Sequence, residues 1–287
     1  MLAWSPIMAR LQRVPNEGAA RSLLRRLARS ARTAQRPRVL AFVNAHALNL
    51  AADSTEFALA LGSADVLLRD GAGVSLLMRR CGQPPGLNMN GTDVIPQLLR
   101  ACDGLSVAVL GTCEPFLGRG LTRLQQELMP RSQVFGVDGF QAGSTYLQLL
   151  GQHRPRVILL AMGMPRQEEM ARWLRGQLTH GCLLICGGAI VDFLAGRTRR
   201  APRLLQRTGL EWLWRLALEP RRLFRRYVIG NPLFLWRLLR LERGGGKAAI
   251  AGYFVDGKGG RGAMLEPTQT SGSRVLAAMR RWIKRWG

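Results

Sequence analysis

Short apolar runs and longer amphipathic segments alternate along the middle of the chain. The runs have the length of buried strands and cover residues 38–43, 64–68, 105–110, 133–137, 157–161 and 183–186. Helical periodicity fills the segments between them, over residues 47–64, 74–80, 94–101, 116–128, 146–152 and 166–178. A Gly or an Asp-Gly pair follows nearly every run. This alternation predicts an α/β fold, a Rossmann-like and mostly parallel sheet with helices on both faces.

Beyond the core the pattern becomes helical throughout. Residues 209–241 carry helical periodicity, a Gly-rich stretch begins at Gly244, and a final basic helix is predicted over about 272–286. Gly-rich stretches of this kind are typical of flexible linkers. We therefore predict four regions, which are an N-terminal extension (1–37), the Rossmann-like core (38–205), a helical appendage (206–243), and a linker with an amphipathic tail (244–287).

The net charge of +24 sits at the two ends of the chain. Residues 1–38 hold nine basic side chains against one acid, and residues 197–287 hold twenty-one against five, while the middle is neutral. In the C-terminal part the basic residues are interleaved with Trp and Leu, as in helices at a lipid headgroup boundary. An anionic membrane surface is the predicted partner, and the appendage is predicted to be membrane-proximal. Nucleic acid and a solvated or protein-binding helix face are the alternatives.

Membrane contact is predicted to be peripheral. No apolar run approaches the roughly 20 residues that span a bilayer, and the N-terminus lacks the continuous apolar region of a signal peptide. The five cysteines form no CxxC motif, so neither a disulfide framework nor a zinc site is indicated. This cysteine usage fits the reducing cytosol.

The carboxyl edge of a parallel sheet is where ligands bind. The residues that follow the predicted strands, and so gather there, are Asn44, Asp70, Gly111, Thr112, Asp138, Gly163, Gly187 and Gly188. Short Gly-containing loops before helices can hold phosphate. Neither GxGxxG nor GxxxxGK[ST] is present, which disfavours dinucleotides and P-loop nucleotides. A sugar nucleotide, whose diphosphate needs neither motif, is the favoured ligand.

Six motifs in order carry a resemblance to a known family over roughly residues 39–240. They lie at residues 43–49, 70–74, 90–93, 163–168, 187–202 and 209–222. Together they resemble the WecG/TagA/CpsF glycosyltransferases of bacterial polysaccharide and teichoic-acid biosynthesis. The resemblance implies a metal-independent, inverting transfer of a sugar from a UDP-sugar to a polyprenyl-diphosphate-linked sugar. It also implies that no cofactor is used and that the enzyme works at the cytoplasmic face of the inner membrane.

The resemblance assigns catalytic roles to three residues. Asp70 is the expected general base, because an inverting transferase must deprotonate the attacking acceptor hydroxyl. Asn44 is expected to orient the sugar or the acceptor, and Gln167 to contact a diphosphate at the start of its helix. The structural alternatives are an Asp-Gly turn for Asp70, a cap for Asn44 and a surface helix position for Gln167.

The remaining expected site residues bind substrate. Asp192 is expected to hold the uridine ribose or to cap its helix, and the glycines after the strands are expected to offer amide groups to phosphate. Without a metal motif, the leaving diphosphate needs cationic side chains. The candidates, which could instead bind lipid headgroups, are Arg215, Arg221, Arg222, Arg225 and Arg226.

Two positions depart from the family pattern. Phe42 stands where the family usually has Thr, and Asn88 stands where relatives often carry Arg. The second departure favours a neutral hexose donor such as UDP-glucose over UDP-N-acetylmannosamine, and both donors stay open. A catalytically inactive nucleotide-sugar-binding protein and a basic nucleic-acid-binding protein are the alternative functions. Homo-oligomerisation also stays open.

Overall fold

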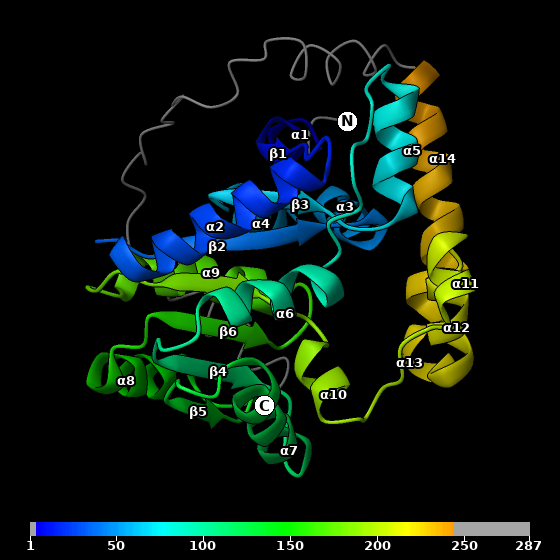
Figure 1. Cartoon of the computed structure of the whole chain (residues 1–287). Helices are drawn as coiled ribbons and strands as arrows, with labels where there is room; N and C mark the ends of the chain where they lie inside the picture. Colours follow the sequence, from blue (N-terminus) through cyan, green and yellow to red (C-terminus); the bar gives the residue numbers. More distant parts are fainter. Residues whose placement is uncertain (1–3, 244–287) are drawn as a thin grey trace. The chain divides into compact units, whose positions relative to one another are not determined.

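The computed structural model describes residues 4–243 of the chain. Within them one all-parallel sheet has the strand order β1-β3-β2-β7-β6-β4-β5 (Figure 1). The strands are β1 (Leu11–Gln12), β2 (Arg38–Val43), β3 (Val66–Arg69), β4 (Val107–Gly111), β5 (Val134–Val137), β6 (Val157–Ala161) and β7 (Leu183–Cys186). The predicted α/β fold with a parallel sheet is confirmed. The predicted linker and tail, 244–287, lie outside the described residues.

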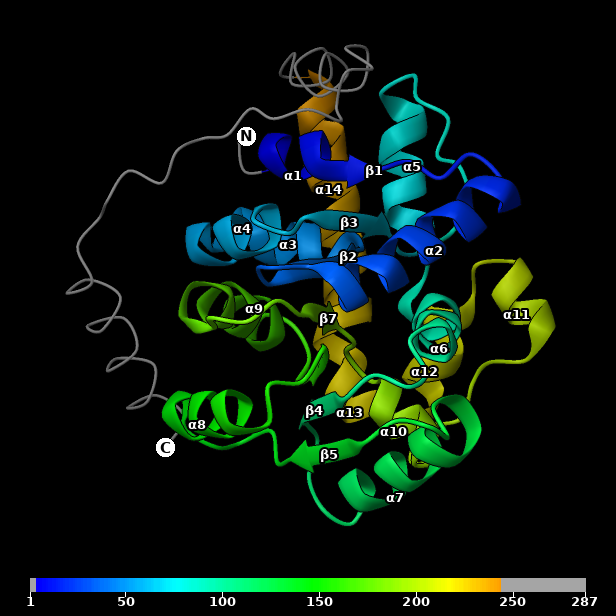
Figure 2. The same ribbon diagram turned by 60° about the vertical axis from the view of Figure 1, so that its left-hand side comes forward.

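Helices cover both faces of the sheet, as Figures 1 and 2 show. One face packs against α1 (Ser5–Arg10), α3 (Ala45–Asp53), α4 (Thr55–Gly62), α8 (Gly143–His153) and α9 (Arg166–Gln177). The other packs against α2 (Glu17–Thr33), α6 (Gly91–Ala101), α7 (Phe116–Arg123) with the π-helical η1 (Leu124–Leu128), and α10 (Ile190–Leu194). Because both faces are covered, the central strands are continuous apolar runs rather than alternating ones.

The basic N-terminal segment contributes elements to this α/β unit. Strand β1 pairs with β3 and extends the sheet by one edge strand. Helix α2 buries Ala20, Leu23, Leu27 and Ala31, a spacing that forms one helical stripe. This stripe lies in the core beside α6, while most of the arginines of α2 are exposed. The segment therefore has an apolar face toward the core and a cationic face toward solvent.

The C-terminal helices stand at the carboxyl ends of the strands (Figure 1). They are α11 (Arg203–Arg207), α12 (Glu211–Leu218), α13 (Pro220–Phe224), the π-helical η2 (Arg225–Ile229) and α14 (Gly230–Arg243). Helix α5 (Ala72–Arg80) follows β3 at the same edge. No helix within residues 4–243 has both the length and the apolar character needed to cross a bilayer.

Helix α14 is fixed to the core by apolar and polar contacts. Phe234 is buried, and its ring lies 5.7 Å from that of Trp4, the residue that precedes α1. The buried Asn49 of α3 donates a hydrogen bond from Nδ2 to the Gly230 carbonyl at 2.7 Å. Arg237 donates to the Asn49 carbonyl at 2.8 Å and also pairs with Asp53. The last helix of the appendage is therefore continuous with the hydrophobic core.

Candidate active site

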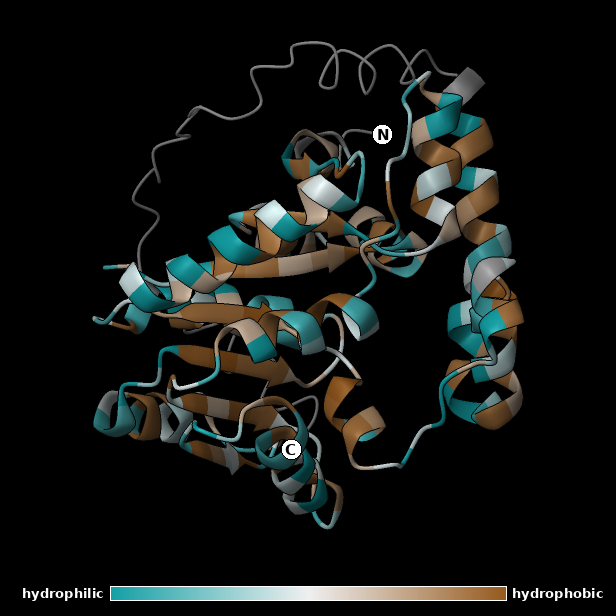
Figure 3. Cartoon of the chain, in the orientation of Figure 1, coloured by the Kyte–Doolittle hydropathy of each residue, from teal (hydrophilic) through white to brown (hydrophobic). Residues whose placement is uncertain are grey.

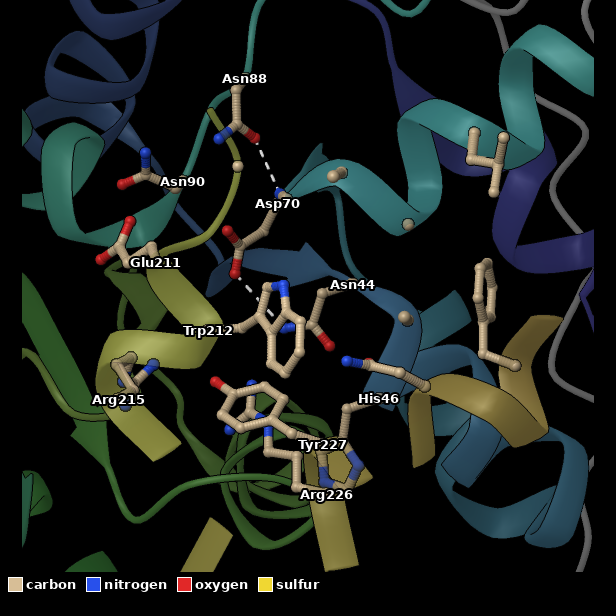
Figure 4. A pocket seen from close by; sticks show the side chains of 18 of the residues that line it. Asn44, His46, Asp70, Asn88, Asn90, Glu211, Trp212, Arg215, Arg226 and Tyr227 are labelled. Atoms are coloured by element: carbon tan, nitrogen blue, oxygen red, sulfur yellow. Dashed lines mark hydrogen bonds between the residues drawn. The ribbon is translucent and has the colours of Figure 1, made fainter. Parts of the chain in front are cut away.

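A cavity of about 490 Å³ lies between the ends of β2 and β3 and the C-terminal helices (Figure 4). The strand side contributes the turns after β2 and β3 and the loop around Asn88 and Asn90. The opposite wall comes from α12, η2 and α14. Segments far apart in the sequence therefore meet around one space, at the edge where a parallel sheet binds ligands.

Asn44 and Asp70 meet inside this cavity. Asn44 caps α3, because its Oδ1 accepts a hydrogen bond from the Ala47 amide at 3.0 Å. Its Nδ2 donates to Asp70 Oδ2 at 3.3 Å, and the Asp70 amide donates to the Val43 carbonyl at 2.8 Å. The capping alternative for Asn44 is therefore correct, and it fixes the same side chain against the Asp70 carboxylate.

The environment of Asp70 raises its pKa above the ordinary value. Burial is the largest cause, since it disfavours the charged form. The hydrogen bond from Asn44 and the positive charges of Arg226, Arg215 and Arg69 act in the opposite direction. A carboxylate with a raised pKa is a stronger proton acceptor, provided that nearby cations keep it ionised. Asp70 has the raised pKa, and Arg226, Arg215 and Arg69 supply positive charge beside it.

Hydrogen bonds from Arg69 and to Asn88 hold the Asp70–Gly71 turn in place. Arg69 is buried and donates to the Gly71 and Gly86 carbonyls, both at 3.0 Å. The Gly71 amide donates to Asn88 Oδ1 at 2.8 Å. Gly71 itself has a φ of +86°, which an L-residue rarely adopts. Asp70 thus sits on an anchored turn, with Asn88 as part of the anchor.

Two arginines of the C-terminal helices line the cavity, Arg215 and Arg226. Arg215 lies over the Phe193 ring at 5.6 Å, and Arg226 lies over Tyr227 at 5.3 Å. The Nε atoms of both arginines are buried and have no hydrogen-bond partner among residues 4–243. The cavity therefore contains cationic groups with unused donors.

The other predicted arginines lie elsewhere on these helices. Arg221, Arg222 and Arg225 are exposed and do not line the cavity. Arg222 donates to Glu219 at 2.5 Å. The structure thus separates one cavity-facing pair from an exposed group on the same short stretch of chain.

His46 also lines the cavity. Burial, and then the nearby positive charge of Arg226, lower its pKa to about 4. Its imidazole is therefore neutral at physiological pH. It adds a hydrogen-bonding group to the cavity without adding charge.

The remaining predicted edge residues form a second cluster outside the cavity lining, at the ends of β4, β5, β6 and β7. Thr112 Oγ1 donates to Asp192 Oδ1 at 2.8 Å, and Asp138 Oδ1 accepts from the Phe140 amide at 2.7 Å. Arg215 connects the two regions, because Phe193 beneath it is the neighbour of Asp192. Polar residues therefore extend along the carboxyl edge of the sheet from the cavity toward β4.

The four predicted phosphate-binding glycines fall into two pairs. A Cβ on Gly111 would overlap the Ala161 backbone, and one on Gly187 would overlap Leu159, so these two permit close packing. Gly163 and Gly188 face open space and have positive φ angles. Only the second pair lies where a ligand could approach the backbone.

Gln167 is buried rather than at the surface. Its Oε1 accepts from the Gly188 amide at 2.8 Å, and its Nε2 donates to Glu168 Oε1 at 2.7 Å. Glu168 is 1% exposed, and burial raises its pKa to about 8. In this structure Gln167 therefore supports the turn after β7 from inside the protein.

Several cavity residues were not among the predicted site residues. Glu211, Trp212, Tyr227 and Phe234 all come from the appendage. The family motif at 209–222 contains two of them, but nothing in a linear sequence shows which side of α12 faces the strand ends. Among the described residues, no group of three or more His, Cys, Asp or Glu side chains is placed to hold a metal ion.

Comparison with known proteins identifies relatives of this chain. A 26% identical relative from Bacillus spizizenii aligns over 200 residues, 68% of this chain and 76% of its own. A 24% identical relative from Staphylococcus aureus aligns over 204 residues, 70% of this chain and 79% of its own. Both are named N-acetylglucosaminyldiphosphoundecaprenol N-acetyl-beta-D-mannosaminyltransferase.

The family comparison covers a larger part of the chain. The profile described as the glycosyl transferase WecG/TagA/CpsF family matches residues 10–247. This span includes β1, the whole core and the C-terminal helices that close the cavity. The protein belongs to the WecG/TagA/CpsF family of glycosyl transferases.

Proposed function

We propose that this protein transfers a sugar from a UDP-sugar to a sugar linked through diphosphate to a polyprenyl lipid, with inversion at the anomeric carbon. The proposal rests on one observation, which is that Asp70, Arg215 and Arg226 all line the same cavity. A base and counter-charges for a leaving diphosphate are the two requirements of such a transfer. The named activity of the two relatives, transfer to a lipid-diphosphate sugar, supports the same reaction class.

The proposed reaction is a single displacement. Asp70 takes the proton of the acceptor hydroxyl while its oxygen attacks the anomeric carbon from the face opposite UDP. The bond from that carbon to the diphosphate oxygen breaks, and Arg215 and Arg226 stabilise the negative charge that develops there. Asn44, which donates to Asp70 Oδ2, holds the carboxylate in the direction of the acceptor. We propose that no metal ion is needed for this step.

We propose that the uridine half of the donor lies over the second edge cluster. Gly163 and Gly188 leave the backbone open there, and Asp192 and Thr112 supply polar groups. A diphosphate between this cluster and Asp70 would pass Arg215, which borders both. Gln167 then acts through the Gly188 turn instead of touching the diphosphate.

The donor sugar is either N-acetylmannosamine or a neutral hexose such as glucose. The names of the relatives favour the first. Asn88, which replaces an arginine common in the family, lines the cavity as a neutral side chain, and it favours the second. The product belongs to an exopolysaccharide or another cell-surface glycan.

We propose that the appendage rests on the cytoplasmic face of the inner membrane. Its exposed apolar side chains are Leu210, Leu213, Leu218, Phe224, Val228, Ile229, Leu235, Trp236 and Leu239. Figure 3 shows hydrophobic and hydrophilic positions interspersed along the C-terminal helices. Exposed arginines such as Arg221 and Arg225 lie on the same helices. This mixture suits a bilayer surface better than a nucleic-acid backbone.

The direct test is a donor panel with a synthetic acceptor. The full-length protein is incubated with UDP-glucose, UDP-N-acetylmannosamine and other UDP-sugars, together with a polyprenyl-diphosphate sugar. We expect one donor to release UDP only when the acceptor is present, and the product to have the inverted anomeric configuration by NMR. Duplex DNA binding without any UDP release would support the nucleic-acid alternative instead, and donor binding without transfer would support the inactive one.

A further inference from the structure

A second carboxylate, Glu211, faces the same cavity as Asp70. It is the first residue of α12 and is half-buried. In Figure 4 its carboxylate lies near Asn90, on the Asp70 side of α12. The cavity therefore holds one carboxylate from the strand edge and one from the appendage.

The Glu211 carboxylate has an unused capacity to accept hydrogen bonds. No group within residues 4–243 donates a hydrogen bond to it or forms an ion pair with it. Burial raises the pKa of Glu211, since it disfavours the charged form. The positive charges of Arg200 and Arg215 act in the opposite direction and lower this pKa, while Arg200 pairs with Asp93 and Arg215 lies over Phe193. A ligand that donates a hydrogen bond from a hydroxyl or an N–H would stabilise the carboxylate.

A glutamate in the first turn of a helix has a simpler explanation. There it stabilises the helix through the positive end of the dipole. Glu17 does this at the first position of α2, where it is exposed. Glu211 differs because it lines a cavity and is close enough to Asp70 for the two charges to interact. The dipole alone does not account for that placement.

We propose that Glu211 is a specificity-determining residue that accepts a hydrogen bond from a non-reacting hydroxyl of the acceptor sugar. The inference rests on the proposed function. If Asp70 removes the proton of the reacting hydroxyl, the same ring brings its other hydroxyls toward the opposite wall, where Glu211 lies. Because Glu211 belongs to α12, the acceptor sugar is held between the core and the appendage.

The test combines acceptor analogues with a substitution. Synthetic polyprenyl-diphosphate acceptors, each lacking one non-reacting hydroxyl, are compared with the complete acceptor by kcat/KM. A hydrogen bond to a charged group predicts that one analogue loses roughly 10–100-fold with the wild type. Glu211→Ala is expected to lose a similar factor on the complete acceptor and nothing further on that analogue. The donor KM is expected to stay unchanged.

Two further variants complete the experiment. Glu17→Ala removes a glutamate from the same helical position outside the cavity and is expected to leave kcat/KM unchanged. Glu211→Gln keeps the shape of the side chain in case the alanine variant fails to fold. It is expected to reduce the difference in kcat/KM between the complete acceptor and the analogue that lacks the bound hydroxyl.

Other patterns would overturn the inference. A uniform loss on every acceptor would make Glu211 a structural residue, and a raised donor KM would assign it to the donor. An unchanged preference between the complete acceptor and the analogues would exclude any role in specificity. Absence of transfer by the wild type would overturn the proposed function as well. Because the wild type is assayed first, this outcome is distinguished from a failure of the Glu211 inference alone.

Discussion

Glu168 is a buried ionisable residue that is connected through Gln167 to the turn after β7. Its Oε1 accepts a hydrogen bond from Gln167, which in turn holds the Gly188 amide. Burial raises its pKa to about 8, so the carboxyl is largely protonated at neutral pH in the folded protein. Its Oε2 is buried and without a hydrogen-bond partner among the described residues.

Glu168→Gln is predicted to change how stability depends on pH. The native pKa lies above the unfolded value of 4.5, so folding binds a proton between these values. The free energy of unfolding of the wild type therefore falls as the pH rises from 4.5 to about 8, by about 1 kcal/mol per pH unit from this group. The glutamine variant, which mimics the protonated form, lacks this loss.

Urea unfolding of both proteins at pH 5, 6.5 and 8 measures the difference. Glu169, whose pKa is raised to about 7, titrates in both proteins and cancels in the comparison. Parallel stability profiles over this range would show that Glu168 is ionised in the native state at all three pH values.

Some site residues are predictable from sequence because the strands place them. Asn44 and Asp70 follow β2 and β3, which are neighbours in a parallel sheet, and strand ends on one edge lie close together. Glu211 and the direction of Arg226 are not predictable in this way. They depend on how α12 and η2 fold back over the strand ends, and local periodicity does not encode that arrangement.

At the scale of elements, the contact between α3 and α14 attaches the appendage to the core. Asn49 donates to the Gly230 carbonyl and accepts from Arg237, and it is 5% exposed. Asn49→Ala is predicted to lower the free energy of unfolding by about 1–3 kcal/mol, because Gly230 and Arg237 lose a buried partner. Asp53→Ala, which removes the exposed partner of Arg237, is predicted to cost less than about 1 kcal/mol. Equal effects in urea unfolding would contradict this ranking.

The arginines of the appendage are predicted to separate by function. Replacing Arg215 and Arg226 by Ala should lower turnover on a soluble, short-chain acceptor, because the leaving diphosphate loses its counter-charges. A loss on the order of 10²–10³-fold is expected for removing such a group. Replacing the exposed Arg221 and Arg225 should instead weaken binding to anionic liposomes. If both pairs changed only liposome binding, the appendage would be an anchor and not part of the active site.

The elements differ in how clearly the sequence predicts them. Buried strands such as β6 are predictable because both faces are covered and every position is apolar. Helix α2 and strand β1 were not predicted, because the high arginine content of residues 1–37 obscured the stripe of Leu23, Leu27 and Ala31. A two-residue edge strand such as β1 also gives no periodic signal. Its pairing depends on β3, which lies far along the chain.

At the scale of the whole chain, charge and exposed apolar side chains coincide on the appendage. Replacing Ile229 and Trp236 by Ala is predicted to weaken liposome binding while leaving turnover on a soluble acceptor unchanged, because neither residue lines the cavity. Leu59→Ala is the control, since Leu59 is equally exposed but lies on α4. Vesicle sedimentation measures the liposome binding of the Ile229/Trp236 variant and of the Leu59 control. An equal effect of the control would show that general surface hydrophobicity, and not this surface, determines binding.

The central claim is that Asp70 is the base of a sugar transfer to a lipid-diphosphate acceptor. The most direct measurement is single-turnover transfer by Asp70→Asn with the UDP-sugar already bound, beside a binding assay for the same donor. The account predicts donor binding close to that of the wild type and a transfer rate lower by a factor on the order of 10²–10⁴, the usual contribution of a positioned base. A transfer rate close to that of the wild type would contradict the account.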